Sequence, residues 1–172
     1  SSFSGCTSLS KINSNTVGEA ILPDAITTIG DSAFQGCTGF TYVNLGESLL
    51  TTGTNTFEGC TNLVRIDIPE TVTSIGKCSF KNCSNVQYFN SDVAGVLNVP
   101  TSCTSLAEYC FEGMDKMTTV NIGDRVTSIG VGILLGANHV ENITLPFVGL
   151  SIKTDDSSYL SKFGMIFGYA TT

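Results

Sequence analysis

Short runs of alternating apolar and polar residues recur along the chain and predict brief, half-buried strands. Residues 63–68 carry the recurring apolar residues Leu63, Ile66 and Ile68. Ile66 and Ile68 alternate with the polar residues Arg65 and Asp67. A period of two places successive side chains on opposite faces of a strand. The same apolar spacing, whole or in part, occurs at residues 9–12, 40–45, 63–68, 86–89, 117–122 and 140–145. The pattern therefore predicts a series of similar short strands.

The distances between these runs identify an internal repeat. An F-x-G/N-C-T/S phrase occurs at residues 34–38, 57–61 and 80–84, with a period of 23 residues. Between the copies, V-T-S-I-G at residues 72–76 predicts a second extended segment in each unit. Agreement at so many positions indicates one structural unit used repeatedly, so the repeat governs the fold prediction.

Two of the units are longer than the others. The distances from Phe3 to Phe34 and from Phe80 to Phe111 are both 31 residues, which is the period of 23 plus eight. The extra residues fall within residues 13–22 and 90–99, so that Pro23 and Pro100 align at a separation of 77. Duplication of a three-repeat block explains this, and so do two independent insertions into the same loop.

A unit of this length cannot bury its own apolar edge, so neighbouring units must stack into a solenoid. We expect about six units, with six strands about 4.8 Å apart in a parallel sheet about 29 Å long. The corner at residues 31–36 is too short for an ordinary helix, so we expect a helical or 3₁₀ turn there. The recurrent phenylalanines should stack as a column. The predicted fold class is α/β, mostly β: a leucine-rich-repeat solenoid.

Composition narrows the range of partners. Charged residues make up 13% of the 172 residues, and the net charge is −7. This acidic balance argues against nucleic-acid binding, which requires clustered Lys and Arg. No apolar run approaches the roughly 20 residues that span a bilayer. We therefore expect a module with neither a nucleic-acid partner nor a membrane span in this segment.

The complete phrase L-x-x-I-x-I-P-x-x-V-T-x-I-G-x-x-x-F-x-N-C, which runs here from Leu63 to Cys83, resembles the BspA-type leucine-rich repeat of bacterial surface proteins. Thr52 departs from it where Ile is expected. The resemblance covers residues 1–146, and residues 147–172 are similar to a segment that follows such repeats. It implies a solenoid that starts within a repeat, a C-terminal capping or connecting segment, and a longer parent protein. It also implies a secreted or wall-attached location, with binding to host matrix proteins or other cells and no enzyme activity.

The seven cysteines predict core packing better than metal chemistry. Four of them share one repeat position: Cys6, Cys37, Cys60 and Cys83. Residues at one repeat position stack along the solenoid instead of converging, and paired C-x-x-C motifs are absent. Met114 and Ala137 stand at the same position in other units, which favours a buried apolar role. A disulfide among the remaining three stays open: Cys78, Cys103 and Cys110.

Catalytic chemistry has little support in the sequence. His139, the single histidine, stands at a predicted surface turn, and no G-x-S-x-G motif supplies a nucleophile. Asp155 and Asp156 lack the spacing of a calcium loop. A glycan hydrolase would need paired carboxylates in a cleft, whereas Asp67 and Glu141 fall on different, non-adjacent strands. We expect no enzyme activity, no metal and no cofactor.

The outward face of the first strand in each unit is the remaining candidate surface. Aromatic, Asn and Arg side chains on a rigid sheet supply hydrogen bonds and anchors at low entropic cost. The candidate partner-binding residues are Tyr42, Asn44, Arg65, Asp67, Tyr88, Asn90, Thr119 and Asn121. The leading hypothesis is a protein-recognition or adhesion module that binds a protein or cell-surface ligand, such as a host matrix protein. The alternatives are an ordinary solvated face and a structural spacer that presents other domains.

Overall fold

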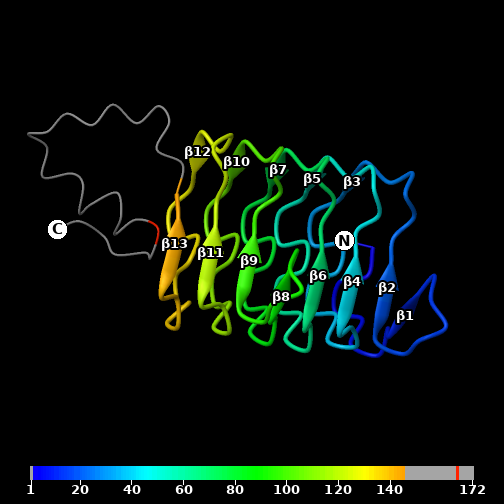
Figure 1. Cartoon of the computed structure of the whole chain (residues 1–172). Coiled ribbons are helices and arrows are strands. Elements are labelled where there is room, and N and C mark those ends of the chain that lie inside the picture. Colours follow the sequence, from blue (N-terminus) through cyan, green and yellow to red (C-terminus); the bar gives the residue numbers. More distant parts are fainter. Residues whose placement is uncertain (1, 146–165, 167–172) are drawn as a thin grey trace, which may run out of the picture.

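The computed structural model describes residues 2–145 and residue 166, which wind into a solenoid with two parallel sheets (Figure 1). Sheet A contains, in spatial order, β1 (Lys11–Ile12), β2 (Glu19–Ile21), β4 (Tyr42–Asn44), β6 (Arg65–Asp67), β8 (Tyr88–Phe89), β9 (Val96–Asn98), β11 (Thr119–Asn121) and β13 (Asn142–Thr144). Sheet B contains, in spatial order, β12 (Ser128–Ile129), β10 (Ser105–Leu106), β7 (Ser74–Ile75), β5 (Thr51–Thr52) and β3 (Thr28–Ile29). The predicted mostly β leucine-rich-repeat solenoid is confirmed.

Within residues 2–145, sheet A has eight strands, so the expectation of six was wrong. In each long unit two consecutive strands pair directly, with Lys11 opposite Glu19 and Tyr88 opposite Val96. Residues 13–18 and 90–95, here called the first and second insertion loops, return the chain to the start of the added strand. A parallel connection usually needs a dozen or more residues. Strands of two or three residues are short enough for six to suffice, so each insertion adds a strand to sheet A and none to sheet B.

The interior is a continuous apolar stack built from the inward residue of each strand. Val43, Ile66 and Phe89 lie in register on neighbouring strands and are all buried. Each buried side chain of this kind stabilises the fold by about 1.5–3 kcal/mol before entropy is subtracted. Because each coil buries its apolar edge against the next, the stacking of coils is the main stabilising interaction.

The predicted phenylalanine column is confirmed. Successive ring centroids from Phe3 through Phe34, Phe57 and Phe80 to Phe111 lie 5.4, 5.2, 5.6 and 6.2 Å apart, and all four pairs are stacked. Aromatic pairs at these distances contribute about 0.5–1.5 kcal/mol beyond the area that they bury. Phe3 at the start of the column is 41% exposed, whereas Phe80 in its middle is fully buried.

The corner at residues 31–36 forms hydrogen-bonded turns and not the helical or 3₁₀ turn that was expected. The N–H groups of Ser32, Phe34 and Gly36 donate to carbonyls of the next coil over 2.8, 2.9 and 2.8 Å. Only the intervening N–H groups bond within the corner, as from Ala33 to Gly30. Because alternate donors are used between coils, a continuous run of helical hydrogen bonds cannot form.

The cysteines of the shared repeat position are buried, as predicted, except for Cys6, which is exposed. All seven cysteines are free thiols, so the disulfide that the sequence left open is not formed. The thiols also bridge coils: Cys60 Sγ lies 3.0 Å from the Phe34 carbonyl, and Cys83 Sγ lies 3.2 Å from that of Phe57. Burial raises the pKa of Cys60 to about 12, so the donor keeps its proton at neutral pH. Cysteine is therefore a weak donor here as well as a small apolar residue.

Thr52, the departure from the repeat pattern, has a partner in the next coil. Its side chain is almost fully buried, and its hydroxyl lies 2.9 Å from that of Ser79 and accepts the Gly76 N–H over 3.0 Å. Both buried hydroxyls are thus hydrogen-bonded, which offsets the cost of removing them from water. A polar pair replaces apolar packing at this one level of the stack.

The predicted C-terminal capping or connecting segment, residues 147–172, lies outside the described residues apart from Ile166. The carbonyl of Ile166 accepts the N–H of Leu134 over 2.9 Å.

Candidate binding surface on sheet A

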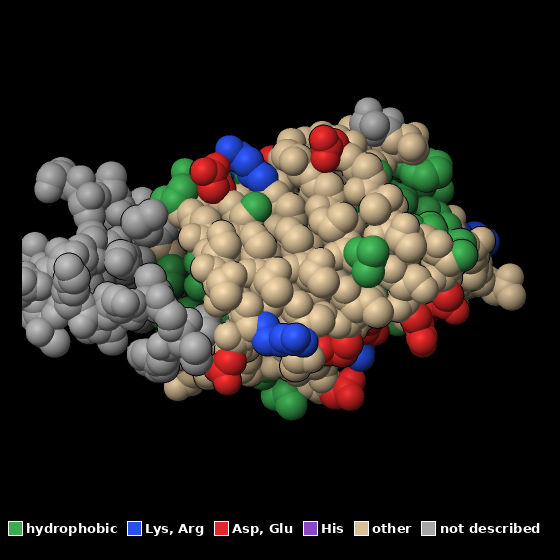
Figure 2. All heavy atoms as spheres, turned by 90° about the horizontal axis from the view of Figure 1, so that it is seen from above, with side chains coloured by type: hydrophobic (Ala, Val, Ile, Leu, Met, Phe, Trp, Pro, Cys, Tyr) green, Lys and Arg blue, Asp and Glu red, His purple; other side chains and the backbone are tan. Residues whose placement is uncertain are grey.

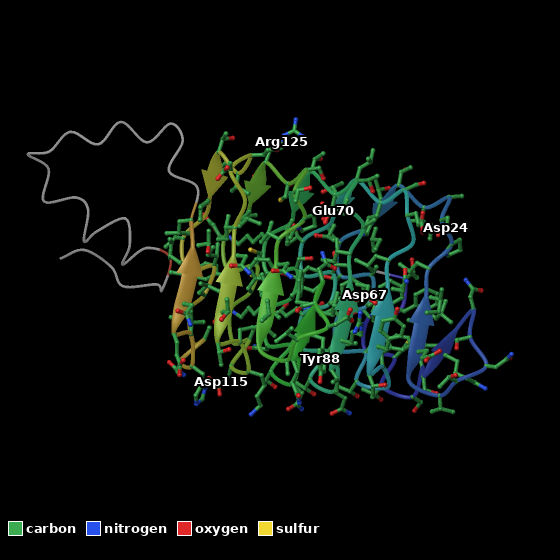
Figure 3. All side chains as sticks on the ribbon, in the orientation of Figure 1. Asp24, Asp67, Glu70, Tyr88, Asp115 and Arg125 are labelled. Atoms are coloured by element: carbon green, nitrogen blue, oxygen red, sulfur yellow. The ribbon has the colours of Figure 1, made fainter. Side chains whose placement is uncertain are left out.

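Seven of the eight predicted binding residues lie on the outer face of sheet A, where strand alternation places them; Asn90 lies after β8, at the start of the second insertion loop. Each lies beside an inward core residue, and the registers put Arg65 between Tyr42 and Tyr88. Two residues further along the same strands, Asn44 lies opposite Asp67. Figure 3 shows Asp67 and Tyr88 near the middle of the sheet. The two tyrosines and the arginine therefore occupy three neighbouring strands.

Asp67 is the centre of a hydrogen-bond network on this face. The Tyr42 hydroxyl donates to Asp67 Oδ2 over 2.8 Å, and Arg65 Nε lies 3.1 Å from both Asp67 oxygens. Arg65 Nη1 also donates to Asp92 Oδ1 over 2.9 Å. These carboxylates, Asp67 first and Asp92 second, hold the pKa of Arg65 above its ordinary value. The pKa of Tyr42 is raised too, first by burial and further by the hydrogen bond to Asp67. Tyr42, Arg65 and Asp67 are therefore joined in one hydrogen-bond network.

Asparagine side chains at this face form hydrogen bonds between neighbouring strands. Asn90 has a positive φ of 49°, a conformation that asparagine tolerates, and its side-chain oxygen accepts the Ile68 N–H over 2.6 Å. Asn98 donates to the Asn90 carbonyl over 2.8 Å, and Asn121 donates to the Asn98 side chain over 2.9 Å. Of the predicted residues, Asn90 and Asn121 are thus engaged in contacts within the sheet.

The added strand β9 separates Tyr88 from Thr119. Val96 pairs with Tyr88 on one side and with Thr119 on the other, so the predicted row is divided into two parts. Sequence reasoning missed Val96, Asn98 and the loop residue Asp92 as members of this face. Residues 90–99 predicted only extra length. The predicted strands are equally short, but their apolar spacing recurs once in every repeat unit, whereas β9 is an addition that this spacing does not mark.

Sheet B offers a contrasting outer face. Its outward strand positions are hydroxyl residues in register: Thr28, Thr51, Ser74, Ser105 and Ser128. Figure 2, which looks down on the side where sheet B lies in Figure 1, shows mostly uncharged polar side chains and backbone, with charged groups near the margins. Aromatic and Arg anchors are the residues enriched at interface centres. Sheet A carries them and this row of sheet B does not.

His139 lies where the sequence placed it, at an exposed turn. Its Nδ1 is 3.1 Å from Asp115 Oδ1, and Figure 3 places Asp115 at the turns below the strands of sheet A. Within residues 2–145 and residue 166, no three His, Cys, Asp or Glu side chains lie close enough together to hold a metal ion. The pair Asp155 and Asp156 lies outside the described residues. In the part of the chain that the structure describes, no helix is long and apolar enough to cross a membrane.

Stacked short coils, two parallel sheets of short strands and a phenylalanine column define a leucine-rich-repeat protein. The model of the BspA-type leucine-rich-repeat region matches residues 1–93 and 88–161, with six copies in all. The chain belongs to the BspA-type leucine-rich-repeat family. A comparison with curated protein sequences found no match.

Two solved structures illustrate the similarity. A leucine-rich-repeat protein of T. pallidum has a TM-score of 0.65 at 21% identity, over 76% of this chain and 71% of that one. A leucine-rich-repeat protein of Bacteroides ovatus also has a TM-score of 0.65, at 27% identity over 74% of this chain. The aligned region spans only 33% of the Bacteroides ovatus protein. The first likeness supports the fold alone, and the second adds a sequence relationship to a bacterial repeat protein.

Proposed function

We propose that this chain is a non-enzymatic protein-recognition module of a bacterial surface protein, and that it binds through the outer face of sheet A. The observation that carries the proposal is the arrangement of Tyr42, Arg65 and Tyr88 on three neighbouring strands. Tyr and Arg are enriched among the residues that dominate binding energy at protein interfaces. The location and the adhesive role are what membership of the family suggests for it.

Rigidity supports this choice of face. Tyr42 and Arg65 are both held by Asp67, and the strands that carry them are fixed by the buried core beneath. A partner that binds them need not first order these side chains, an entropic cost of about 0.5–1.5 kcal/mol for each flexible side chain. The same network also satisfies much of their hydrogen-bonding capacity, which is the observation that favours the alternative of a structural spacer.

A triple alanine variant at Tyr42, Arg65 and Tyr88 separates the two functions. The matched control is alanine at Thr51, Ser74 and Ser105, which are outward in register on sheet B. Retention on host matrix proteins and on whole cells should fall at least tenfold for the sheet A variant and remain unchanged for the control. Undiminished binding by the sheet A variant would leave the module as a spacer.

A further inference from the structure

The second insertion loop brings a carboxylate onto the proposed binding face. Asp92 extends from residues 90–95 to Arg65 on β6, although its side chain is 92% exposed. Arg65 thus bridges two carboxylates, one from its own strand and one from the loop. The cluster of one positive and two negative side chains has an excess negative charge. Asp92 is the most exposed of the three side chains, so this charge is accessible to a partner in solvent.

An exposed aliphatic side chain lies beside that charge. Val93 is 64% exposed, and of the other exposed large apolar residues in residues 2–145 and residue 166, Val17 is exposed to a similar degree and Phe3 and Leu50 are less exposed. Tyr88, the strand residue two positions before the loop, lies in register with Arg65. The loop that follows Tyr88 on β8 therefore carries an exposed aliphatic group next in sequence to the carboxylate that contacts Arg65, the register partner of Tyr88.

The first insertion loop shows that the fold itself does not need these side chains. In both loops a serine hydroxyl accepts the N–H two residues later over 3.0 Å, at Ser14 and at Ser91. This alignment places Asn15 where the second loop has Asp92, and Thr16 where it has Val93. The same backbone is thus built with an uncharged residue at the position of the carboxylate, so the turn does not need the charge. The first loop also exposes a valine, Val17, but one position later than Val93.

We propose that the second insertion loop, with Arg65 and Tyr88, binds an extended polypeptide segment carrying a Lys or Arg and, two residues away, an aliphatic residue. The basic group would pair with Asp92 and lie over the Tyr88 ring, where cations are attracted to the aromatic face. Residues two apart in an extended segment point to the same side, so the aliphatic residue reaches Val93. The net charge of −7 favours the approach of a basic partner. This proposal rests on the proposed function and identifies the chemistry of its partner.

Fluorescence anisotropy with labelled peptides tests the proposal on the full chain. The probe is a short Ser/Thr-rich peptide with one Lys and one Val two residues apart, and its control has Glu in place of Lys. The Lys peptide should bind and weaken as salt is added, since screening reduces charge pairing. The Glu peptide should bind at least tenfold more weakly. Equal affinity for the two peptides, or no binding of the Lys peptide, would overturn the proposal.

The two loops supply the matched variants. Asp92→Asn copies Asn15 and should reduce affinity for the Lys peptide about tenfold, the scale of one charged hydrogen bond. Val93→Thr copies Thr16 and should reduce it several-fold, whereas Asn15→Asp in the first loop should not reduce it. If Asp92→Asn binds the peptide like the unaltered chain, the proposal fails. If Asp92→Asn also still binds the host partners that the sheet A triple variant loses, the proposed function is retained and the peptide-binding proposal is rejected.

Discussion

The two lengthened units, which begin at Phe3 and Phe80, place nearly the same backbone in two different settings. Each carries an asparagine at positive φ, Asn13 at 50° and Asn90 at 49°, and a glycine at positive φ five residues later. In each, that glycine carbonyl accepts a threonine hydroxyl of the next coil over 3.3 Å. The first unit ends the sheet, since β1 pairs only with β2, whereas the second lies between β6 and β11.

The difference between the units teaches which interactions belong to the repeat and which to a site. The positive-φ asparagine and glycine and the threonine hydrogen bond are common to both units, so they belong to the repeat. The contact between Asp92 and Arg65 exists only in the second unit, where a preceding strand supplies the arginine. Position in the stack therefore decides whether a loop can work together with the sheet.

The largest effect should come from the phenylalanine that starts each unit. Phe80 is fully buried and stacks on Phe57 and Phe111, with the edge of Phe89 also in contact. Phe80→Ala should cost about 3–5 kcal/mol of unfolding free energy, as for other buried aromatic truncations. Phe3→Ala, at the exposed end of the column, should cost about 1 kcal/mol or less. Urea unfolding measures both, and equal costs would show that the ends of the stack are as tightly packed as its middle.

The loop glycines should rank next. A Cβ at Gly95 would lie 2.7 Å from the Thr118 hydroxyl, and one at Gly18 would lie 2.5 Å from that of Thr41. Both also have positive φ, so alanine is strained at either site by about 1–3 kcal/mol. We expect the full cost from Gly95→Ala. Gly18→Ala should lose less global stability, because the terminal strand can detach locally. Hydrogen exchange should show faster exchange confined to residues before Gly18, and uniform acceleration in Gly18→Ala would contradict this.

Alkaline pH should reveal the burial of the repeat cysteine Cys83. Burial raises the pKa of Cys83 well above its ordinary value of 9.0. The folded chain keeps this thiol protonated while the unfolded chain ionises, so the stabilising contribution is complete below pH 9 and is lost as pH rises toward the folded pKa. Each such thiol adds a slope of about 1.4 kcal/mol per pH unit. Cys83→Ala should therefore flatten the fall in stability above pH 9 relative to the unaltered chain, measured by urea unfolding at a series of pH values. Identical pH profiles for Cys83→Ala and the unaltered chain would be the contrary result.

The smallest effect on stability should come from Asp92→Asn. The carboxylate is almost fully exposed, and surface ion pairs contribute little to folding. Its thermal midpoint should match that of Asn15→Asp within error, even though only the Asp92 change is expected to weaken peptide binding. A clear drop in the midpoint would mean that the contact with Arg65 holds the loop in place.

Several features followed from sequence alone because they repeat. The period of 23 residues is sufficient to predict stacked coils, and the recurring F-x-G-C phrase predicts the aromatic column and the buried cysteines. The outward positions of Tyr42, Arg65 and Tyr88 follow from period-two alternation. Residues 90–99 were harder, because the added strand lies outside the apolar spacing that recurs once in each repeat unit. Their length was detected, and the added strand was not.

The sequence by itself determined the repeat, the fold class and the outward side of Tyr42, Arg65 and Tyr88, because those depend on local periodicity. Only the tertiary structure decided that Ser79 hydrogen-bonds to Thr52 and that Arg65 hydrogen-bonds to Asp92. The two residues of each pair are 27 positions apart in the sequence. The physical reason is that register between coils sets these contacts. Two inserted strands shift that register on sheet A and leave sheet B unchanged.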